Sequence, residues 1–573
     1  MFHIDMYPFD GDAPASIERL KHNKENTGTN WPVVYVLNND KEAYIGETVN
    51  ASRRASQHLE NEQRKKLTEI RIISDSKFNK SVVLDLESFL IRHMASDGKY
   101  VLQNGNNGVQ NHNYYGKSEY EEEFRKIWNK LKKLKVVSHG IDDIENSELF
   151  KYSPYKALGD DQIVAEMEIL KAFAEHGQSE EGVSIIVRGG AGTGKTILAI
   201  YLLKLFADIG NEPVEGNFNL DQLMDEDSET IYAAESITGI RKIGIVTPQK
   251  SLQTSLKEVF SGIRNLNKAM VMSPAEVVKN YKETKEKYDL LLVDEAHRLK
   301  TKKRGNLQSN KRHYDINESL GYEKKEGTEL DWLLDCSRNQ ILFRDELQTV
   351  RPSDMWADEF KQVLSNHNRV VVEQALSTQW RCNGGNDYVE YLKGVFSGRK
   401  MSKKQFGNYD VKLFSNCKQM IEDIKLKDKE IGLCRNVAGY AWPWNKKRTD
   451  LYTIEIQGEK YRWNRTYDNW IVSKTAVDEI GCIHTVQGYD LNYTGLIIGN
   501  DIKYDVENSR IISDKTCYYD LLGKAGAADD PELLKDYLCN IYLTLMTRGI
   551  KGTYIYVCDD NLREYFAKYF EVV

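Results

Sequence analysis

A glycine-rich segment between two apolar stretches constrains the fold of this chain more than any other feature. Residues 185–188 (Ile-Ile-Val-Arg) have the β-branched character of a strand, and residues 197–200 (Ile-Leu-Ala-Ile) continue as a helix would. Between them lie Gly189, Gly190, Ala191, Gly192, Thr193, Gly194, Lys195 and Thr196. This order predicts a phosphate-binding loop, because backbone N–H groups and the positive end of the helix converge on one anion. We expect Lys195 to reach the β- and γ-phosphates of ATP, and Thr196 to ligate Mg²⁺.

Two adjacent carboxylates further along the chain supply a partner for this loop. Residues 288–293 form an apolar run that ends in Asp294 and Glu295. An acidic strand end is common on its own, but together with a phosphate-binding loop it predicts a hydrolytic site. We expect Asp294 to complete the Mg²⁺ shell and Glu295 to polarise the attacking water.

Strand-like runs alternate with helical segments through most of the chain. The runs lie at residues 183–187, 243–246, 290–293, 340–343, 370–372, 480–483, 496–498 and 553–557. This alternation predicts an α/β fold with parallel sheets. A chain of 573 residues is too long for one ordinary core, so we expect several domains. The predicted parts are an N-terminal extension (1–30), a small α+β domain (31–135), a linker (136–155), two parallel-sheet lobes (156–365 and 366–573), and insertions at 211–238 and 301–328.

The predicted α+β domain begins with a β-hairpin. Two short apolar runs, at 33–37 and 43–46, flank an Asn-Asn-Asp turn. A polar helix follows from Asn50 to about residue 66, with Asn50 or Ser52 as its N-cap. Residues 82–93 are amphipathic, and a charged helix at 118–135 leads out of the domain.

Several segments after the glycine-rich loop resemble the motifs of a known protein family. Asp294-Glu295-Ala296-His297 and the segments after it resemble superfamily 1 helicases. From about residue 150 to 573 the chain resembles a bacterial helicase-like family related to the motor half of Schlafen proteins. The matching stretches are 152–156 with Gln162, 244–248, 343–348, 379–385, 438–442, 483–490 and 545–549.

This resemblance implies two RecA-like motor lobes and several further roles. Gln162 is expected to recognise adenine, and Gln348 to sense the γ-phosphate or link it to the strand site. Arg381 and Arg548 are expected to act as arginine fingers, since a planar guanidinium stabilises transition-state charge. The remaining expected nucleotide contacts are Gln487, Gly488 and Asp490. Asp490 stands where related motors often have Glu.

The N-terminal region resembles the GIY-YIG nuclease family over about residues 31–115. The matching residues are Tyr35, Tyr44-Ile45-Gly46, Arg54, His58, Glu87 and Asn104. The first Gly-Ile of that family is Val33-Val34 here, although the tyrosine after it is kept. Arg54 is favoured over Arg53 because Arg54 and His58, four residues apart, share one helix face.

The nuclease resemblance implies a metal-dependent phosphodiesterase site. Glu87 is its expected metal ligand, preferring Mg²⁺ as a hard oxygen donor, with Mn²⁺ as an alternative. Tyr35 is expected to help deprotonate the attacking water, assisted by Tyr44 and His58. Arg54 holds the scissile phosphate and Asn104 orients the site.

Composition excludes some classes and leaves others open. The net charge of −7 does not indicate a nucleic-acid-binding protein. A local basic surface, at 130–135 or 300–312, is nevertheless sufficient to bind nucleic acid. No apolar run reaches membrane-spanning length and no signal peptide is visible, so we expect no membrane partner and a cytoplasmic protein. The eight cysteines lack zinc spacing, which indicates reduced, buried thiols.

These features predict an ATP-dependent nuclease–helicase or translocase that acts on nucleic acid, DNA in preference to RNA. Bacterial anti-phage defence is the expected setting, by analogy with fused nuclease–motor proteins, and repair is the alternative. Two other functions stay open. One is a nuclease directed at RNA, and the other is an ATP-gated switch that binds nucleic acid or a phage protein and restrains the nuclease without unwinding.

Overall fold

The computed structural model divides the chain into two compact units. Unit 1 comprises Met1–Gly159, Ile200–Arg241 and Thr254–Val271, and unit 2 comprises Asp160–Ala199, Lys242–Gln253 and Met272–Val573. The structure describes residues 2–573 except 23–24, 105–113, 156–157, 180, 191, 212–238, 302–306, 346–354, 356, 377, 379–381, 445–450, 467–469, 487–490, 525–526 and 528–529. The predicted insertion at 211–238 therefore lies almost wholly outside the described residues.

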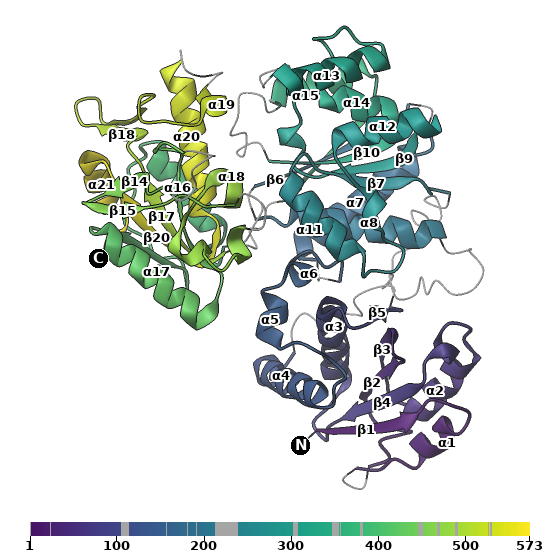
Figure 1. The fold of residues 1–573 in the computed structure, drawn as a ribbon. Coiled ribbons are helices and arrows are strands. Elements are labelled where there is room, and N and C mark those ends of the chain that lie inside the picture. The colour runs from purple at the N-terminus through teal and green to yellow at the C-terminus, as the bar shows by residue number, and fades with distance from the viewer. Residues whose placement is uncertain are drawn as a thin grey trace. The chain divides into compact units, whose positions relative to one another are not determined.

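Unit 1 contains a five-stranded sheet in the order β1-β4-β2-β3-β5 (Figure 1). Its strands are β1 (His3–Pro8), β2 (Val33–Asn38), β3 (Glu42–Thr48), β4 (Glu69–Ser74) and β5 (Val101–Leu102). β2 pairs antiparallel with β3 and with β4, and β5 joins β3 in parallel. The predicted hairpin is thus present, and β4 is a strand that the sequence pattern did not indicate.

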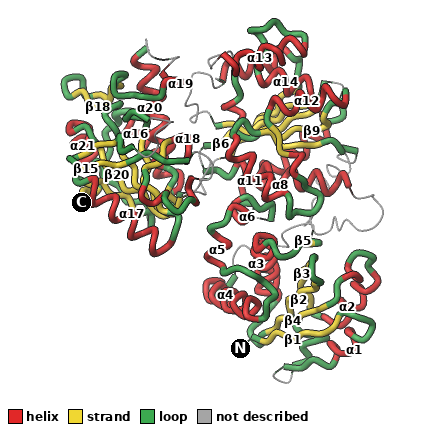
Figure 2. The backbone as a smooth tube through the Cα atoms, viewed as in Figure 1, coloured by secondary structure: helices red, strands yellow, loops and turns green. Residues whose placement is uncertain are grey.

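Helices cover both faces of this sheet (Figure 2). Alternate side chains of β2 enter different cores, as strand geometry requires. Val34 and Val36 face the core built with α3 and α4, whereas Val33 and Leu37 face the core built with α1 and α2. The helices are α1 (Ala13–Glu18), α2 (Ala51–Glu60), the short 3-10 helix η1 (Arg64–Lys66), α3 (Lys80–Asp97), α4 (Lys117–Lys133), α5 (Ile141–Glu145) and α6 (Glu148–Lys151).

Two predicted boundaries of this domain need correction. The segment 1–30, expected as an extension, supplies β1, which pairs with β4, and α1, whose Ile17 is buried in the core. The segment 136–155, expected as a linker, buries Val136, Ile141 and Ile144 in the core that contains α3 and α4. Both segments are short and mostly polar, so their few apolar residues gave no periodic signal.

Unit 2 contains two larger sheets. The first has the order β11-β6-β10-β9-β7-β8, and the second β16-β13-β17-β20-β12-β21. β6 pairs in parallel with β10 and β11, and β17 pairs in parallel with β13 and β20. These sheets confirm the prediction of an α/β fold with parallel-sheet lobes.

The elements of the first sheet carry the phosphate-binding loop. Its strands are β6 (Val183–Gly189), β7 (Ile243–Val246), β8 (Val271–Met272), β9 (Tyr288–Val293), β10 (Ser337–Arg344) and β11 (Val370–Leu376). The helices along this stretch are α7 (Asp160–His176), α8 (Lys195–Asn211), α11 (Lys250–Phe260), α12 (Pro274–Thr284), α13 (Leu307–Leu320), α14 (Glu329–Cys336) and α15 (Ala357–Asn366), with the 3-10 turns η2 (Lys268–Met270) and η3 (Ala296–Arg298). β6 and β9 are buried over nearly their whole length, as expected for parallel strands covered on both faces.

The second sheet forms the C-terminal lobe. Its strands are β12 (Asp410–Phe414), β13 (Cys434–Ala438), β16 (Ile480–Cys482), β17 (Leu491–Ile498), β20 (Gly549–Val557) and β21 (Glu571–Val572). Two hairpins accompany it, β14 (Ile454–Ile456) with β15 (Glu459–Tyr461), and β18 (Ile502–Asp505) with β19 (Arg510–Ser513). Its helices are α16 (Gly385–Phe396), α17 (Cys417–Ile431), α18 (Ile483–Val486), α19 (Leu521–Lys524), α20 (Pro531–Met546) and α21 (Asp560–Ala567), with the turns η5 (Trp470–Val472) and η6 (Ala476–Asp478).

All eight cysteines are free thiols, and most are buried, as expected. Within the described ranges no helix combines the length and apolar character that a bilayer crossing requires.

Candidate functional site

The glycine loop joins β6 to α8 in unit 2. Gly194 has a φ of +78°, a left-handed conformation that favours glycine. Gln162, which is buried on α7, donates from Nε2 to the carbonyl oxygens of Thr193 and Gly194, both at 3.2 Å. A Cβ on Gly194 would lie 2.2 Å from that nitrogen. Gln162 therefore packs directly against the loop whose nucleotide it was expected to recognise.

Lys195 lies at the start of α8 with its ammonium held in place. Nζ donates to the carbonyl oxygens of Gly189 and Gly190, at 2.7 and 2.8 Å. It also lies 3.4 Å from Oδ2 of Asp345, which follows β10. Asp345 was assigned no role from sequence, although strand order could have found it, because β6 and β10 are neighbours and their carboxyl ends meet at one edge.

The two carboxylates after β9 meet the loop through Thr196. The Thr196 hydroxyl donates to Oδ2 of Asp294 at 2.7 Å, which brings together the two residues expected to bind Mg²⁺. Burial, and then Glu295, raise the pKa of Asp294 above its usual value. A bound cation favours the ionised carboxylate in such a place. The hydroxyl, the carboxylate and the glycine loop therefore fit a magnesium–nucleotide complex.

Glu295 is held in an uncommon backbone conformation. Its φ of 55° is left-handed, and its N–H donates to Oδ1 of Asp294 at 3.0 Å. Asp345 N–H donates to Nδ1 of His297, so the ring hydrogen is on Nε2, which lies 3.0 Å from Oε2 of Glu295. Burial acts to raise the pKa of Glu295, but His297 and Arg298 outweigh it and lower that pKa. A lowered pKa favours the ionised carboxylate, the form that polarising a water requires.

Of the remaining residues expected in the motor site, the structure describes only Arg548. Arg548 lies between α20 and β20 with a side chain that is 1% exposed, and its carbonyl accepts from Leu491 N–H at 3.1 Å. Its role as an arginine finger stays a prediction. The other expected residues lie outside the described residues: Ala191, Gln348, Arg381, Gln487, Gly488 and Asp490.

A second polar cluster forms in unit 1 between β2, β3 and α2. The Tyr35 phenol lies 2.8 Å from Nε2 of His58 and accepts from Nε of Arg54 at 3.4 Å. The rings of Tyr44 and His58 are 5.2 Å apart between centroids. The structure therefore brings together four of the six residues expected in the nuclease-like site.

Arg64, on η1, completes this cluster and was missed in the sequence. Its Nη1 lies 3.1 Å from Nδ1 of His58, and its guanidinium carbon lies 4.0 Å from the centre of the Tyr44 ring. Because arginine only donates, Nδ1 must accept, so the ring hydrogen of His58 is on Nε2 and points to Tyr35. Burial, and then Arg64 and Arg54, lower the pKa of His58 to about 3, which keeps the imidazole neutral.

The phenol oxygen of Tyr35 consequently accepts from two donors, His58 and Arg54. This arrangement leaves the phenol's own hydrogen to donate elsewhere, and it stabilises negative charge on the oxygen. Burial opposes that charge and raises the pKa of Tyr35 well above its usual value.

Glu87 lies on α3 among charged neighbours that belong to β3 and the start of α3. Burial, and then Glu47, raise the pKa of Glu87 to about 8. Glu47 forms an ion pair with Lys80. Two neighbouring carboxylates suit a divalent cation, since a cation favours the ionised form of both. Glu47 belongs to the stretch that resembles the nuclease family, but no role was assigned to it from sequence.

The Asn104 side chain forms hydrogen bonds with the backbone of β3. Its Oδ1 accepts from Ile45 N–H at 3.1 Å, and its Nδ2 donates to the Ile45 carbonyl at 2.8 Å. It therefore fixes the strand that carries Tyr44 and Gly46. This contact agrees with a role in orienting the site.

Gly46 leaves the space that the Tyr35 ring occupies. A Cβ at Gly46 would lie 2.3 Å from the phenol oxygen, so Gly46→Ala is expected to displace the ring and lower the free energy of unfolding by about 1–3 kcal/mol. Gly11→Ala is the matched control, since a Cβ there meets nothing within 4 Å. Hydrogen exchange of the β2 and β3 amides measures the difference, and equal protection in the two variants would contradict this packing.

The fold and the first site define a P-loop NTPase whose residues fit ATP and Mg²⁺. A family model described as Schlafen group 3, DNA/RNA helicase domain, matches residues 182–559, well over half of the chain. The chain belongs to this family.

Individual proteins are similar over comparable lengths. An uncharacterized protein of Saccharomyces cerevisiae, YPL245W, is 25% identical over 407 residues, which cover 66% of this chain and 82% of that protein. Arterivirus nonstructural protein 10, a helicase, is 13% identical with a TM-score of 0.28 over 69% of this chain, which spans only 63% of the viral chain. A Bacteroides Pif1 helicase is 12% identical with a TM-score of 0.26, over 69% of this chain and 92% of that one.

Proposed function

We propose that this chain couples an ATP-driven nucleic-acid motor in residues 156–573 to a metal-dependent nuclease of the GIY-YIG type in its N-terminal domain. The observation that carries the nuclease half is the Tyr35 phenol oxygen, which accepts from both His58 and Arg54. Two donors on one phenol suit a group that takes or relays a proton from an attacking water.

The chain's own residues have separable tasks in phosphodiester cleavage. As the phenolate that its two donors stabilise, Tyr35 takes a proton from the water, and neutral His58 holds the oxygen in position. Arg54, partly exposed beside it, offers its guanidinium to a phosphate oxygen. Glu87 is the proposed metal ligand and Glu47 lies close to it; the bound Mg²⁺ or Mn²⁺ supplies charge stabilisation at the phosphate.

In the motor, Lys195 and Thr196 hold the phosphates and Mg²⁺, and Glu295 orients the water that attacks the γ-phosphate. The roles that the family resemblance implies are kept for six further residues: Gln348, Arg381, Arg548, Gln487, Gly488 and Asp490. Opening and closing of the lobes on hydrolysis would then move a strand.

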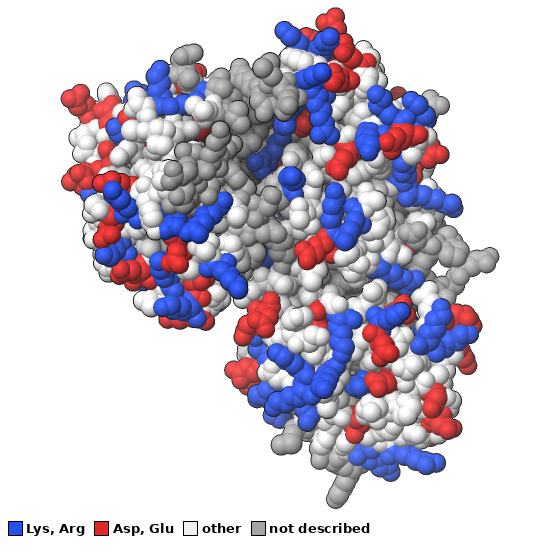
Figure 3. All heavy atoms as spheres, in the orientation of Figure 1, with Lys and Arg blue, Asp and Glu red and all other residues white. Residues whose placement is uncertain are grey.

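A basic surface supports nucleic acid as the partner. Lysine and arginine side chains gather over α4 (Figure 3), whose last turn contains Lys130, Lys132 and Lys133. A local surface of this kind attracts a phosphate backbone although the chain carries a net charge of −7. We favour DNA over RNA, in the cytoplasm, with anti-phage defence as the setting and repair as the alternative.

ATP turnover of the purified chain tests the motor half. We expect single-stranded or duplex nucleic acid to stimulate hydrolysis, and the ratio of stimulation by DNA to that by RNA identifies the substrate. If neither stimulates turnover, the translocase proposal is wrong. An ATP-gated switch is then favoured, provided that ATP still changes the rate of cleavage while strand displacement stays at background.

Arg64→Met tests the nuclease half at a positioning residue. Loss of the neighbouring positive charge raises the pKa of His58 from about 3, so protonation reaches the imidazole at higher pH. We expect cleavage to fall about tenfold to a hundredfold, since the Tyr35–His58 pair is no longer fixed. The acidic side of the pH–rate profile for cleavage should also move to higher pH. The neighbouring Lys65→Met is the control, and an unchanged pH profile in Arg64→Met would contradict the assignment.

A further inference from the structure

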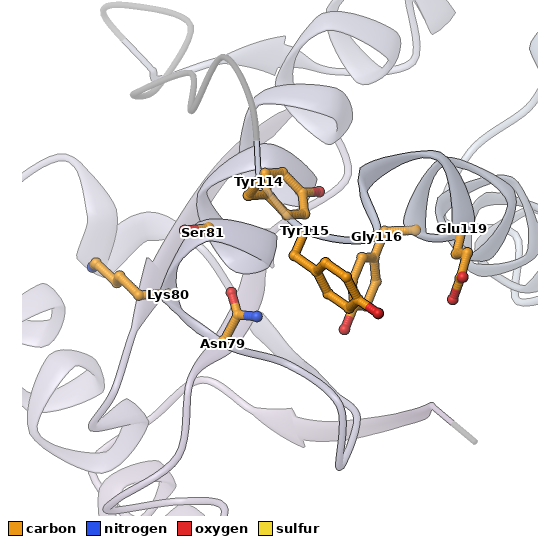
Figure 4. A pocket seen from close by; sticks show the side chains of 8 residues that line it. Asn79, Lys80, Ser81, Tyr114, Tyr115, Gly116 and Glu119 are labelled. Carbon is orange, nitrogen blue, oxygen red and sulfur yellow. The ribbon is translucent and has the colours of Figure 1, made fainter.

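A pocket of about 400 Å³ opens between the first turns of α3 and α4. Its lining includes Asn79, Lys80, Tyr114, Tyr115, Glu119 and Tyr120 (Figure 4). None of these residues has a part in the two sites described above, apart from the ion pair of Lys80 with Glu47. The pocket gathers three aromatic rings and several polar groups on the surface of unit 1.

Two of the three rings are anchored and the third is not buried at all. The Tyr114 hydroxyl donates to Oδ2 of Asp85, and the Tyr120 hydroxyl donates to the carbonyl of Lys77, both at 2.9 Å. Tyr115 is 99% exposed, so its ring covers no other residue that the structure describes. A free aromatic face beside two fixed rings is the arrangement on which single-stranded bases stack.

Hydrogen-bonding groups stand on either side of the exposed ring. Asn79 Oδ1 caps α3 by accepting from Val82 N–H at 3.1 Å, which leaves the amide nitrogen as the group turned toward Tyr115 (Figure 4). The Glu119 carboxylate lies on the other side of Tyr115 (Figure 4). A donor and an acceptor next to an aromatic face match the edge of a nucleobase, which carries both kinds of group.

The pocket is close to the proposed metal ligand along one helix. Lys80 lines the pocket and pairs with Glu47, whereas Glu87 lies seven residues further along α3. Seven residues of helix rise about 10 Å. This length equals about three stacked nucleotides at about 3.4 Å each. A strand in the nuclease site therefore has the reach to place a neighbouring base in the pocket.

We propose that this pocket binds one base of the nucleic-acid strand that the N-terminal domain cleaves. Tyr115 stacks on the base, and Asn79 and Glu119 contact its edge. A carboxylate accepts from an exocyclic amino group, so the pocket favours cytosine over thymine or uracil. This inference rests on the proposed nuclease function and adds to it a subsite that selects the position of the cut.

Photocrosslinking of the full chain tests the subsite directly. A single-stranded DNA oligonucleotide with one 5-iodocytosine is irradiated with the protein, and the attached residue is identified by peptide mass spectrometry. We expect attachment at Tyr115. Tyr115→Phe keeps the stacking face and should keep the crosslink yield, whereas Tyr115→Ala should lower the yield in unit 1 about tenfold. Tyr452→Ala, at a tyrosine that is 53% exposed in unit 2, is the control.

Cleavage by the same variants separates this inference from the nuclease function. Glu119→Gln should reduce the preference for cytosine over thymine at the bound position. If the wild type cleaves but crosslinks map elsewhere in unit 1, or if Tyr115→Ala leaves their yield unchanged, the subsite is wrong and the nuclease stands. If the wild type neither cleaves nor crosslinks within residues 2–159, the nuclease proposal fails as well.

Discussion

Glu295→Gln is expected to lower nucleic-acid-stimulated ATP turnover by about two to four orders of magnitude, the usual contribution of a positioned general base. The side chain keeps its shape but loses the charge that polarises the water. Asp294, Thr196 and Lys195 are left in place, so nucleotide affinity should change little. Steady-state hydrolysis together with binding of a fluorescent ATP analogue measures both quantities.

The control for this variant is Glu283→Gln, at an exposed position on α12. It should turn over ATP at the wild-type rate. A Glu295→Gln protein that retains more than about a tenth of wild-type turnover would contradict the assignment, because a general base contributes far more than that.

Glu87→Gln is expected to lower nucleic-acid cleavage at least a hundredfold while ATP turnover stays unchanged. The amide lacks the negative charge that a hard divalent cation requires of its ligand. Folding should not suffer, since burial already raises the pKa of Glu87 to about 8 and a neutral side chain removes the penalty of burying a charge. Cleavage of a labelled oligonucleotide in Mg²⁺ or Mn²⁺ is the measurement.

Glu62→Gln is the matched control in the same domain, because its carboxylate is largely exposed. Cleavage by Glu87→Gln at the wild-type rate would show that the metal site lies elsewhere. A parallel fall in ATP turnover would instead show that the substitution disturbs more than one domain.

Local patterns predicted the motor well. The strand predicted at 243–246 is β7, and the strand expected before the glycine loop is β6. These strands are mostly apolar because parallel sheets are covered on both faces, and that character is visible in the sequence. The N-terminal domain also contains a helix that the sequence predicted, at 82–93. It is the central part of α3, which runs from Lys80 to Asp97.

Less regular elements were harder to predict. β1 has the sequence His-Ile-Asp-Met-Tyr-Pro and none of its residues is fully buried, so it lacks a clear alternating pattern. β12 and β13 in the second sheet were also missed. Each is short and interrupted by polar residues, and its pairing partners lie far away in the chain.

Some site residues could likewise be predicted from local spacing, and others could not. Arg54 and His58 share one turn of helix, so spacing alone could place them together. Arg64 reaches the same imidazole only because the chain turns after Glu60 and enters η1, and that turn is not encoded in a motif. Asp345 reaches Lys195 through the order of strands in the sheet, which no local pattern reveals.

We propose that one chain couples ATP turnover to nucleic-acid cleavage. The most direct test compares cleavage of linear, nicked and single-stranded DNA, and of RNA, by the wild type with ATP, with a non-hydrolysable analogue and without nucleotide. We predict metal-dependent cleavage whose rate or position changes with ATP hydrolysis, and which Glu87→Gln abolishes. Cleavage that is identical under all three nucleotide conditions, or absent from every substrate, would contradict the account.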